Sequence, residues 1–222
     1  KILMMLMTFV MAFQMLTATA FAIDASDRGN ITVNGVEDGI GISAYRLMDI
    51  SFDYNVQQPK NPMYMWTSEV AGWVSDHYSD FINVSNMNAV EEAFSTAEDV
   101  LVAEFYDELA VAIKDGTVHP ASETLVAEGD VVTIDNLSMG NYFLLIEGGA
   151  KVYRPLTANV VPEWKNNTWV MSHPEVDAKS SEPAIKKTVT SGIEADNAEI
   201  GDTLSFELNA VIPVFPEKKK KK

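Results

Sequence analysis

The chain has 222 residues, of which 32 are acidic and 16 basic, giving a formal net charge of −16. So acidic a chain excludes nucleic-acid binding through phosphate contacts, and it suits an exposed protein that must stay soluble. Because there is no cysteine, no disulfide can form, and stability must come from core burial or from another covalent link.

The N-terminal segment predicts secretion. Residues 2–16 are almost wholly apolar, and the small-residue pattern Ala20-Phe21-Ala22 that follows is typical of a signal cleavage site. We expect residues 1–22 to be a signal peptide cleaved between Ala22 and Ile23, which would be the only part of the chain to contact a membrane. A membrane anchor is the alternative, but the apolar stretch is short for a span.

The mature chain begins with β-structure. Residues 31–35 (ITVNG) predict a short strand that ends in an Asn-Gly turn, and residues 39–52 predict a longer one. The apolar positions of the second strand depart from strict alternation, so we expect a bulge near Arg46. Residues 53–63, rich in Gln, Pro and Asn, predict a loop.

Residues 64–74 are aromatic and predict a returning strand. The run Met63-Tyr64-Met65-Trp66 and Trp73 are assigned to the core, with a sugar-binding aromatic platform as the alternative.

Residues 88–115 predict the clearest helix. Apolar residues recur there every three to four positions, acids fill the other face, Gly116 supplies a stop, and Asn86 or Asn88 could cap the start. The ranges after this helix alternate or are apolar throughout, and we assign them to strands: 131–137, 140–146, 154–161 and a hairpin over 164–171. The predicted class is mainly β, an Ig-like sandwich with an inserted helical segment.

A domain boundary is expected after residue 178. Residues 179–183 are small, polar and proline-marked, as in a linker, and residues 184–217 read as the start of a second β-domain. Residues 218–222 are all lysine, which we attribute to truncation or an added tag. In the first strand of the second domain Lys187 shares a face with Ile185 and Val189, and a lone buried ammonium needs a chemical reason.

Three stretches together resemble sortase-assembled pilins of Gram-positive bacteria. They are ITV followed by ISAYRLMDI (31–33 and 42–50), TIDNLSMGNYFL (133–144), and EPAIKKTV with IGDTLSFEL (182–189 and 200–208). The resemblance implies a pilin N-terminal β-sandwich over residues 23–178, followed by a Cna-B-like domain that forms an isopeptide bond.

The same resemblance implies a function. The chain would be a structural subunit of a surface pilus or a wall-anchored adhesin, located on the cell wall, with no enzymatic turnover, no cofactor and no bound metal. Its partners would be other pilin subunits and a sortase. The alternative is an unpolymerised adhesin module whose ligand is a host glycan or matrix protein.

In that family a first-strand lysine joins an asparagine of the last strand. Burial lowers the lysine pKa so that a neutral amine can attack, and a buried protonated carboxyl polarises the asparagine carbonyl. The matching residue here is Lys187, with Lys186 as the alternative. We expect the asparagine and the acid to lie beyond Glu217.

The first domain departs from the cross-linking pattern. No lysine occurs in residues 31–36, and Ile146 stands at the position of the acid, while Glu147 is one residue off and so faces the other way.

The lysine to which a sortase joins the next subunit also lacks its expected match. Trp169 and Pro174 fit the family motif, but Glu175 stands at the position of the lysine. Lys179 is the nearby candidate, with an ordinary linker lysine as the alternative. His77, His119 and His173 are too far apart in sequence to predict a metal site.

Overall fold

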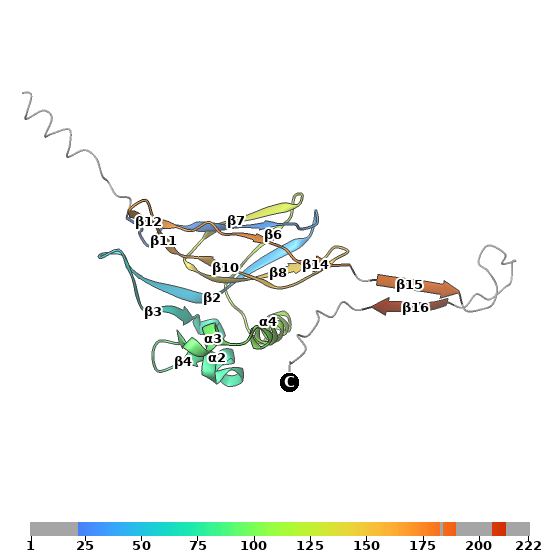
Figure 1. Cartoon of the computed structure of the whole chain (residues 1–222), viewed down its shortest axis with the longest axis horizontal. Coiled ribbons are helices and arrows are strands. Elements are labelled where there is room, and N and C mark those ends of the chain that lie inside the picture. The colour runs from blue at the N-terminus through green and yellow to red at the C-terminus, as the bar shows by residue number, and fades with distance from the viewer. Residues whose placement is uncertain (1–21, 183, 190–205, 212–222) are drawn as a thin grey trace, which may run out of the picture.

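The structure, a computed structural model, describes residues 22–182, 184–189 and 206–211. The predicted signal peptide up to residue 21 and the lysine tail lie outside these residues. The described part has three layers (Figure 1): a small sheet, a large central sheet, and a layer of helices on the opposite face of the central sheet. The predicted mainly β sandwich with a helical segment is confirmed.

The small sheet has the order β13-β1-β7, built from β1 (Gly29–Asn34), β7 (Val131–Leu137) and β13 (Glu175–Asp177). β1 pairs antiparallel with β7 and parallel with β13, so the first and the thirteenth strand of the chain lie side by side. Ile31 and Val33 alternate inward with no exposed surface.

The large sheet has the order β10-β8-β2-β3-β5-β4, with β6 paired to the first half of β2. Its strands are β2 (Gly41–Asp53), β3 (Gln58–Trp66), β4 (Ile82–Asn83), β5 (Ala89–Val90), β6 (Ser122–Val126), β8 (Gly140–Glu147) and β10 (Leu156–Val160). The β2–β8 register shifts between Arg46 and Met48, which confirms the predicted bulge.

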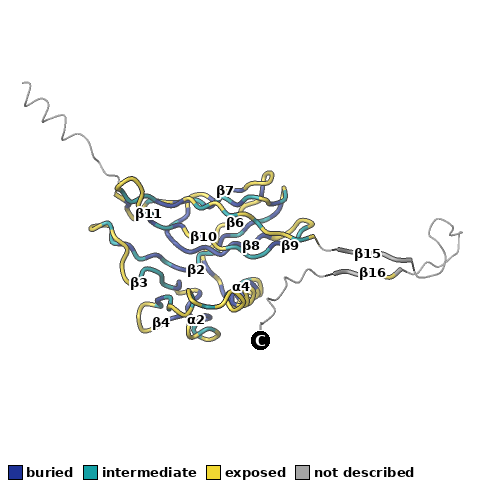
Figure 2. The backbone as a smooth tube through the Cα atoms, viewed as in Figure 1, coloured by how far each residue is buried: buried dark blue, intermediate teal, exposed yellow. Residues whose placement is uncertain are grey.

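Two cores lie on the two faces of the large sheet. Ile42, Ala44 and Leu144 pack toward the small sheet, whereas Leu47 and Phe143 pack toward the helices. Both faces of β8 are covered, so its residues from Gly140 to Ile146 are all buried (Figure 2). Apart from Asn141 the strand is therefore apolar and does not alternate.

The helical layer differs from its prediction. The strand predicted over residues 64–74 is correct only up to Trp66, the end of β3. From Ser68 the chain forms α2 (Ser68–His77), because Val70, Ala71, Trp73 and Val74 recur at helical spacing on one buried side. The predicted loop 53–63 is largely β3, whose exposed side chains gave no apolar signal although its backbone pairs with β2.

The predicted helix 88–115 is wrong in its first part. Ala89 and Val90 form β5, and two helices follow, α3 (Glu92–Thr96) and α4 (Asp99–Lys114). Their N-caps are Glu91 and Glu98, so the prediction that Asn86 or Asn88 caps the helix is also wrong. The break falls at Ala97, whose ψ of 148° is extended. Gly116 ends α4 with a φ of +78°, as predicted.

The remaining elements are short. A 3₁₀ turn, η1 (Ser79–Phe81), follows α2, and the predicted hairpin over 164–171 is confirmed as β11 (Pro162–Lys165) and β12 (Thr168–Met171). β14 (Ser180–Ser181), in the predicted linker, pairs with β9 (Val152–Tyr153). β15 (Ala184–Val189) and β16 (Phe206–Val211) pair antiparallel. No helix within the described ranges is long and apolar enough to cross a membrane.

Candidate functional site

The lysines predicted to cross-link lie in the β15–β16 hairpin. Lys187 is the register partner of Leu208, and Lys186 is the partner of Asn209. Strand alternation places Lys187 on the same face as Ile185 and Val189, and Lys186 on the opposite face. Their side-chain surroundings lie outside the described part, so the buried lysine stays a prediction.

In the first domain, the position at which the pilin family carries the acid of the cross-link is occupied by Ile146. Ile146 is 8% exposed and belongs to the same core cluster as Ile31 and Val33 of β1. Glu147, the next residue, is exposed, and its Oε1 lies 2.8 Å from the Nζ of Lys114 on α4. This carboxylate is therefore paired at the surface and does not enter the sandwich core.

Main-chain hydrogen bonds join β1 to the segment that contains β13. The N–H of Thr32 donates to the carbonyl oxygen of Pro174 at 2.9 Å, and the N–H of Ala178 donates to that of Asn34 at 2.8 Å. These bonds frame the parallel β1–β13 pair, so the last strand of the domain is tied to the first without a side-chain cross-link.

The two candidate sortase positions are both at the surface. Glu175 is exposed on β13, opposite Thr32. Lys179 is exposed between β13 and β14, and its carbonyl oxygen accepts a hydrogen bond from the N–H of Arg154 at 3.0 Å. The backbone of Lys179 is therefore held against the first domain while its amine remains at the surface.

The aromatic residues singled out from the sequence belong mainly to the helical-side core. Trp66 is 2% exposed and donates its indole N–H to the carbonyl oxygen of Phe81, and Trp73 is 9% exposed. The assignment of these two residues to the core is confirmed, and the alternative of a sugar-binding platform built on them is wrong.

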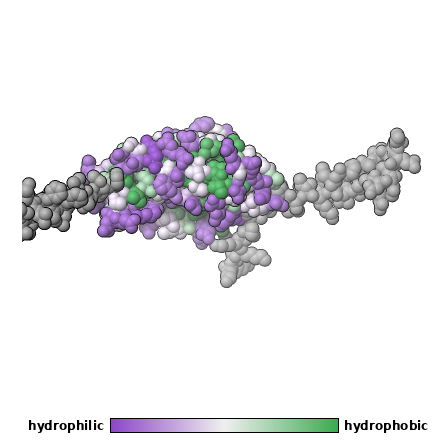
Figure 3. Space-filling view, turned by 90° about the horizontal axis from the view of Figure 1, so that it is seen from above, coloured by the Kyte–Doolittle hydropathy of each residue, from purple (hydrophilic) through white to green (hydrophobic). Residues whose placement is uncertain are grey.

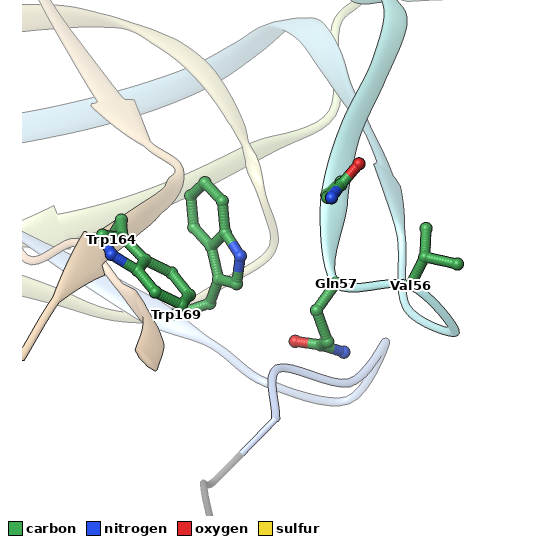
Figure 4. Close-up of a pocket in the computed structure, with 5 residues that line it drawn as sticks. Val56, Gln57, Trp164 and Trp169 are labelled. Carbon is green, nitrogen blue, oxygen red and sulfur yellow. The ribbon is translucent and has the colours of Figure 1, made fainter. Parts of the chain in front are cut away.

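A surface groove elsewhere escaped the sequence reasoning. It has a volume of about 350 Å³ and is lined by Val56, Gln57, Gln58, Trp164 and Trp169 (Figure 4). Trp164 and Trp169 are register partners on β11 and β12, and they face the turn between β2 and β3. The sequence predicted the β11–β12 hairpin itself. It could not predict the groove, because the β2–β3 turn on the other side of the groove is more than a hundred residues away in the chain.

The pKa shifts of Tyr78 and Tyr106 are caused mainly by burial in the core. Burial raises the pKa of Tyr106 to about 12. Burial, and then hydrogen bonding to Glu108, raise the pKa of Tyr78 as well. His77 stacks on Trp73 with ring centroids 4.9 Å apart and contacts its carbonyl oxygen through Nδ1 at 2.9 Å. Among the described residues no three His, Cys, Asp or Glu side chains group as metal ligands.

The sequence and the structure were compared with known proteins. No family model and no curated protein matches the sequence. Among solved structures, the fold is similar to that of a streptococcal backbone pilin. The T6 backbone pilin of serotype M6 Streptococcus pyogenes superimposes with a TM-score of 0.56 at 17% identity, covering 88% of this chain and 38% of that chain. The resemblance stated from the sequence is thus confirmed at the level of the fold.

Two further pilins are similar with lower scores. The major pilins SpaD and SpaA of Corynebacterium diphtheriae give TM-scores of 0.43 and 0.34 at 14% and 16% identity, over 87% and 74% of this chain. The chain spans 38%, 39% and 33% of the length of the three pilins, respectively.

Proposed function

We propose that this chain is a structural subunit of a cell-surface pilus, or a related wall-anchored surface protein, of a Gram-positive bacterium. The observation that carries the proposal is the T6 backbone-pilin fold, which covers 88% of the chain. The acidic composition and the absence of cysteine fit an exposed fibre protein stabilised by means other than disulfides.

We further propose that Lys187 forms an isopeptide bond within the second domain. The lysine nitrogen attacks the side-chain carbonyl of an asparagine, the amide C–N bond breaks, and ammonia leaves, so the reaction needs no oxidant or cofactor. Support comes from the β15–β16 pairing, which places Lys187 on the face shared with the apolar residues Ile185 and Val189.

Lys179 is the proposed attachment point for the neighbouring subunit. It is exposed, lies two residues after the end of β13, and accepts a main-chain hydrogen bond from Arg154, whereas the residue at the expected position, Glu175, has no amine. A pulling force applied through Lys179 would be transmitted along the chain directly to the second domain. The first domain would then lie off the load path, which agrees with its lack of a lysine in β1.

An intact-mass measurement tests the cross-link. In a chain extended through a complete second domain, the mass should be about 17 Da below the sequence mass, the loss of one ammonia. Lys187→Ala should abolish this deficit, and the matched variant Lys186→Ala on the opposite face should keep it. A full mass in the unmutated protein, or a deficit that survives Lys187→Ala, contradicts the assignment.

Polymer formation tests the pilus role itself. When the full-length protein is expressed with its sortase on a Gram-positive cell, we expect a ladder of covalent oligomers on denaturing gels. Lys179→Ala should remove the ladder, and Lys165→Ala, on the exposed β11–β12 hairpin, should leave it. A ladder that is insensitive to Lys179→Ala would move the attachment point elsewhere, and no ladder at all would exclude a polymerised subunit.

A further inference from the structure

We propose that the groove between the β11–β12 hairpin and the β2–β3 turn binds a neutral carbohydrate, with one sugar ring stacked on Trp164. Trp164 is 58% exposed, although an indole ring is among the side chains that gain most from burial. Its partner Trp169 is half-buried, and the two rings form one wall of the groove (Figure 4).

The tryptophan wall is fixed before any ligand arrives. The ring centroids of Trp164 and Trp169 are 5.3 Å apart in an edge-to-face arrangement, and Trp169 meets the buried ring of Phe52 edge-to-face at 5.5 Å. The hairpin is closed by the two-residue turn Asn166-Asn167, with φ of 50° and 61°, a turn that matches the strand twist. A rigid ring loses little freedom when a ligand stacks on it.

The facing wall is fixed by hydrogen bonds of a neutral side chain. The Gln57 amide accepts from the N–H of Ile23 at 3.0 Å and donates to the carbonyl oxygens of Ile23 and Tyr54 at 2.9 and 2.6 Å. Gln58, the next residue along the rim, is exposed and carries a second carboxamide. Because the two N–H donors of Gln57 are used in these bonds, the Gln58 carboxamide, which can both donate and accept, is the group offered to ligand hydroxyls.

The chemistry of the lining selects the class of ligand. The groove contains two indole rings, two carboxamides and a valine, with no charged side chain. The nearest charged residues in sequence are paired with each other, Lys165 with Glu163 and Lys60 with Asp53. A pyranose has an apolar face of C–H bonds, which suits the electron-rich face of an indole, and a rim of hydroxyls, which suits the carboxamide of Gln58.

The dimensions favour a small ligand over a protein partner. A volume of about 350 Å³ is at the lower end of the range for small-molecule sites. A stable protein interface buries about 800 Å² on each side. The exposed large hydrophobic residues of these two hairpins are only Tyr54, Val56 and Trp164 within the described part. The face in Figure 3 is mostly hydrophilic, and its hydrophobic areas are separate from one another.

A binding screen with site-resolved detection tests the proposal on the full chain. The probes are immobilised neutral mono- to tetrasaccharides of glucose, galactose, mannose and N-acetylglucosamine. A sugar that binds should shift the indole N–H resonances of Trp164 and Trp169 in a two-dimensional NMR spectrum. The resonances of Trp66 and Trp73, which are buried on the helical side, should stay in place.

Two variants decide the result. Trp164→Ala should weaken the binding by at least about tenfold. Val111→Ala, which truncates a 62% exposed side chain on α4, should leave it unchanged. A blank screen, or binding that Trp164→Ala does not weaken, overturns the proposal. If the screen is blank and Trp164→Ala instead reduces self-association in sedimentation, the groove is a contact between protein subunits. None of these outcomes affects the polymer test.

Discussion

The ring of Tyr106 on α4 stacks on the ring of Phe143 on β8, with centroids 5.3 Å apart and planes 11° from parallel. This contact joins the helical layer to the central sheet. Leu144, the next residue of β8, points into the other core, so one strand carries both cores on its two faces.

Removing the Phe143 ring should therefore destabilise the whole first domain. Phe143 has no exposed surface, and Phe143→Ala is expected to lower the free energy of unfolding by about 3–5 kcal/mol. The measurement is urea unfolding followed by circular dichroism. Val111→Ala is the matched control, expected to change stability by less than about 0.5 kcal/mol. Equal effects of the two variants would mean that the helical layer does not depend on this contact.

Two glycine-to-alanine substitutions should have opposite signs. A Cβ on Gly29 would lie 2.5 Å from Cγ1 of Val160 and 2.8 Å from the carbonyl oxygen of Ser172, so Gly29→Ala should cost about 1–3 kcal/mol. A Cβ on Gly72, inside α2, meets no atom within 4 Å, and Gly72→Ala should gain about 0.5–1 kcal/mol. Melting temperatures of both variants check the pair, and a stable Gly29→Ala protein would contradict the tight packing at the start of β1.

Alkaline pH should unfold the protein partly through Tyr106. Its pKa is raised from 10.0 to about 12 because burial disfavours the phenolate. The folded state thus holds the proton more tightly than the unfolded state. The resulting stability is complete below the unfolded pKa of about 10 and is lost as pH rises through the folded pKa of about 12.

The check is a series of urea midpoints across this pH window. Tyr106→Phe should reduce the alkaline loss of stability, because it removes one of the tyrosines with a raised pKa. Tyr54→Phe, which removes a hydroxyl at a 39% exposed surface position, is the control and should leave the loss as it is in the unmutated protein. An unchanged alkaline profile in Tyr106→Phe would contradict the assignment.

The parallel β1–β13 pair should be sensitive to one backbone donor. Thr32→Pro removes the N–H that donates to the carbonyl oxygen of Pro174, and it should cost about 1–3 kcal/mol in urea unfolding. Thr32→Val loses only the 3.3 Å contact between the Thr32 and Thr133 hydroxyls and keeps the N–H, so it should be far milder. Similar losses of stability in both variants would show that the Thr32 side chain, and not its main-chain hydrogen bond to Pro174, stabilises this strand pair.

The errors in the predicted fold share one cause, which is that local pattern does not report the neighbours of a segment. Residues 64–74 were predicted as one strand because they are aromatic, but from Ser68 onward the burial has helical spacing against α4 and β8. Ala89 and Val90 fit a helical pattern, yet they pair with Met65 and Ile82, which come earlier in the chain. The first part of β3 was missed because residues 58–61 have exposed side chains without an apolar alternation, although their strand pairs with β2.

The sequence alone determined the bulge near Arg46, the β7, β8 and β11–β12 strands, the helix stop at Gly116 and the resemblance to pilins, since each rests on local pattern. The signal peptide that it predicts lies outside the described residues and stays a prediction. The sequence also singled out Lys187 and Lys179, whose roles remain predictions. The assignment of Trp66 and Trp73 to the core needed the tertiary structure to exclude the alternative, and only the tertiary structure decided that Trp164 is at the surface. Burial of an aromatic ring depends on the segments packed against it, and those segments are distant in the chain.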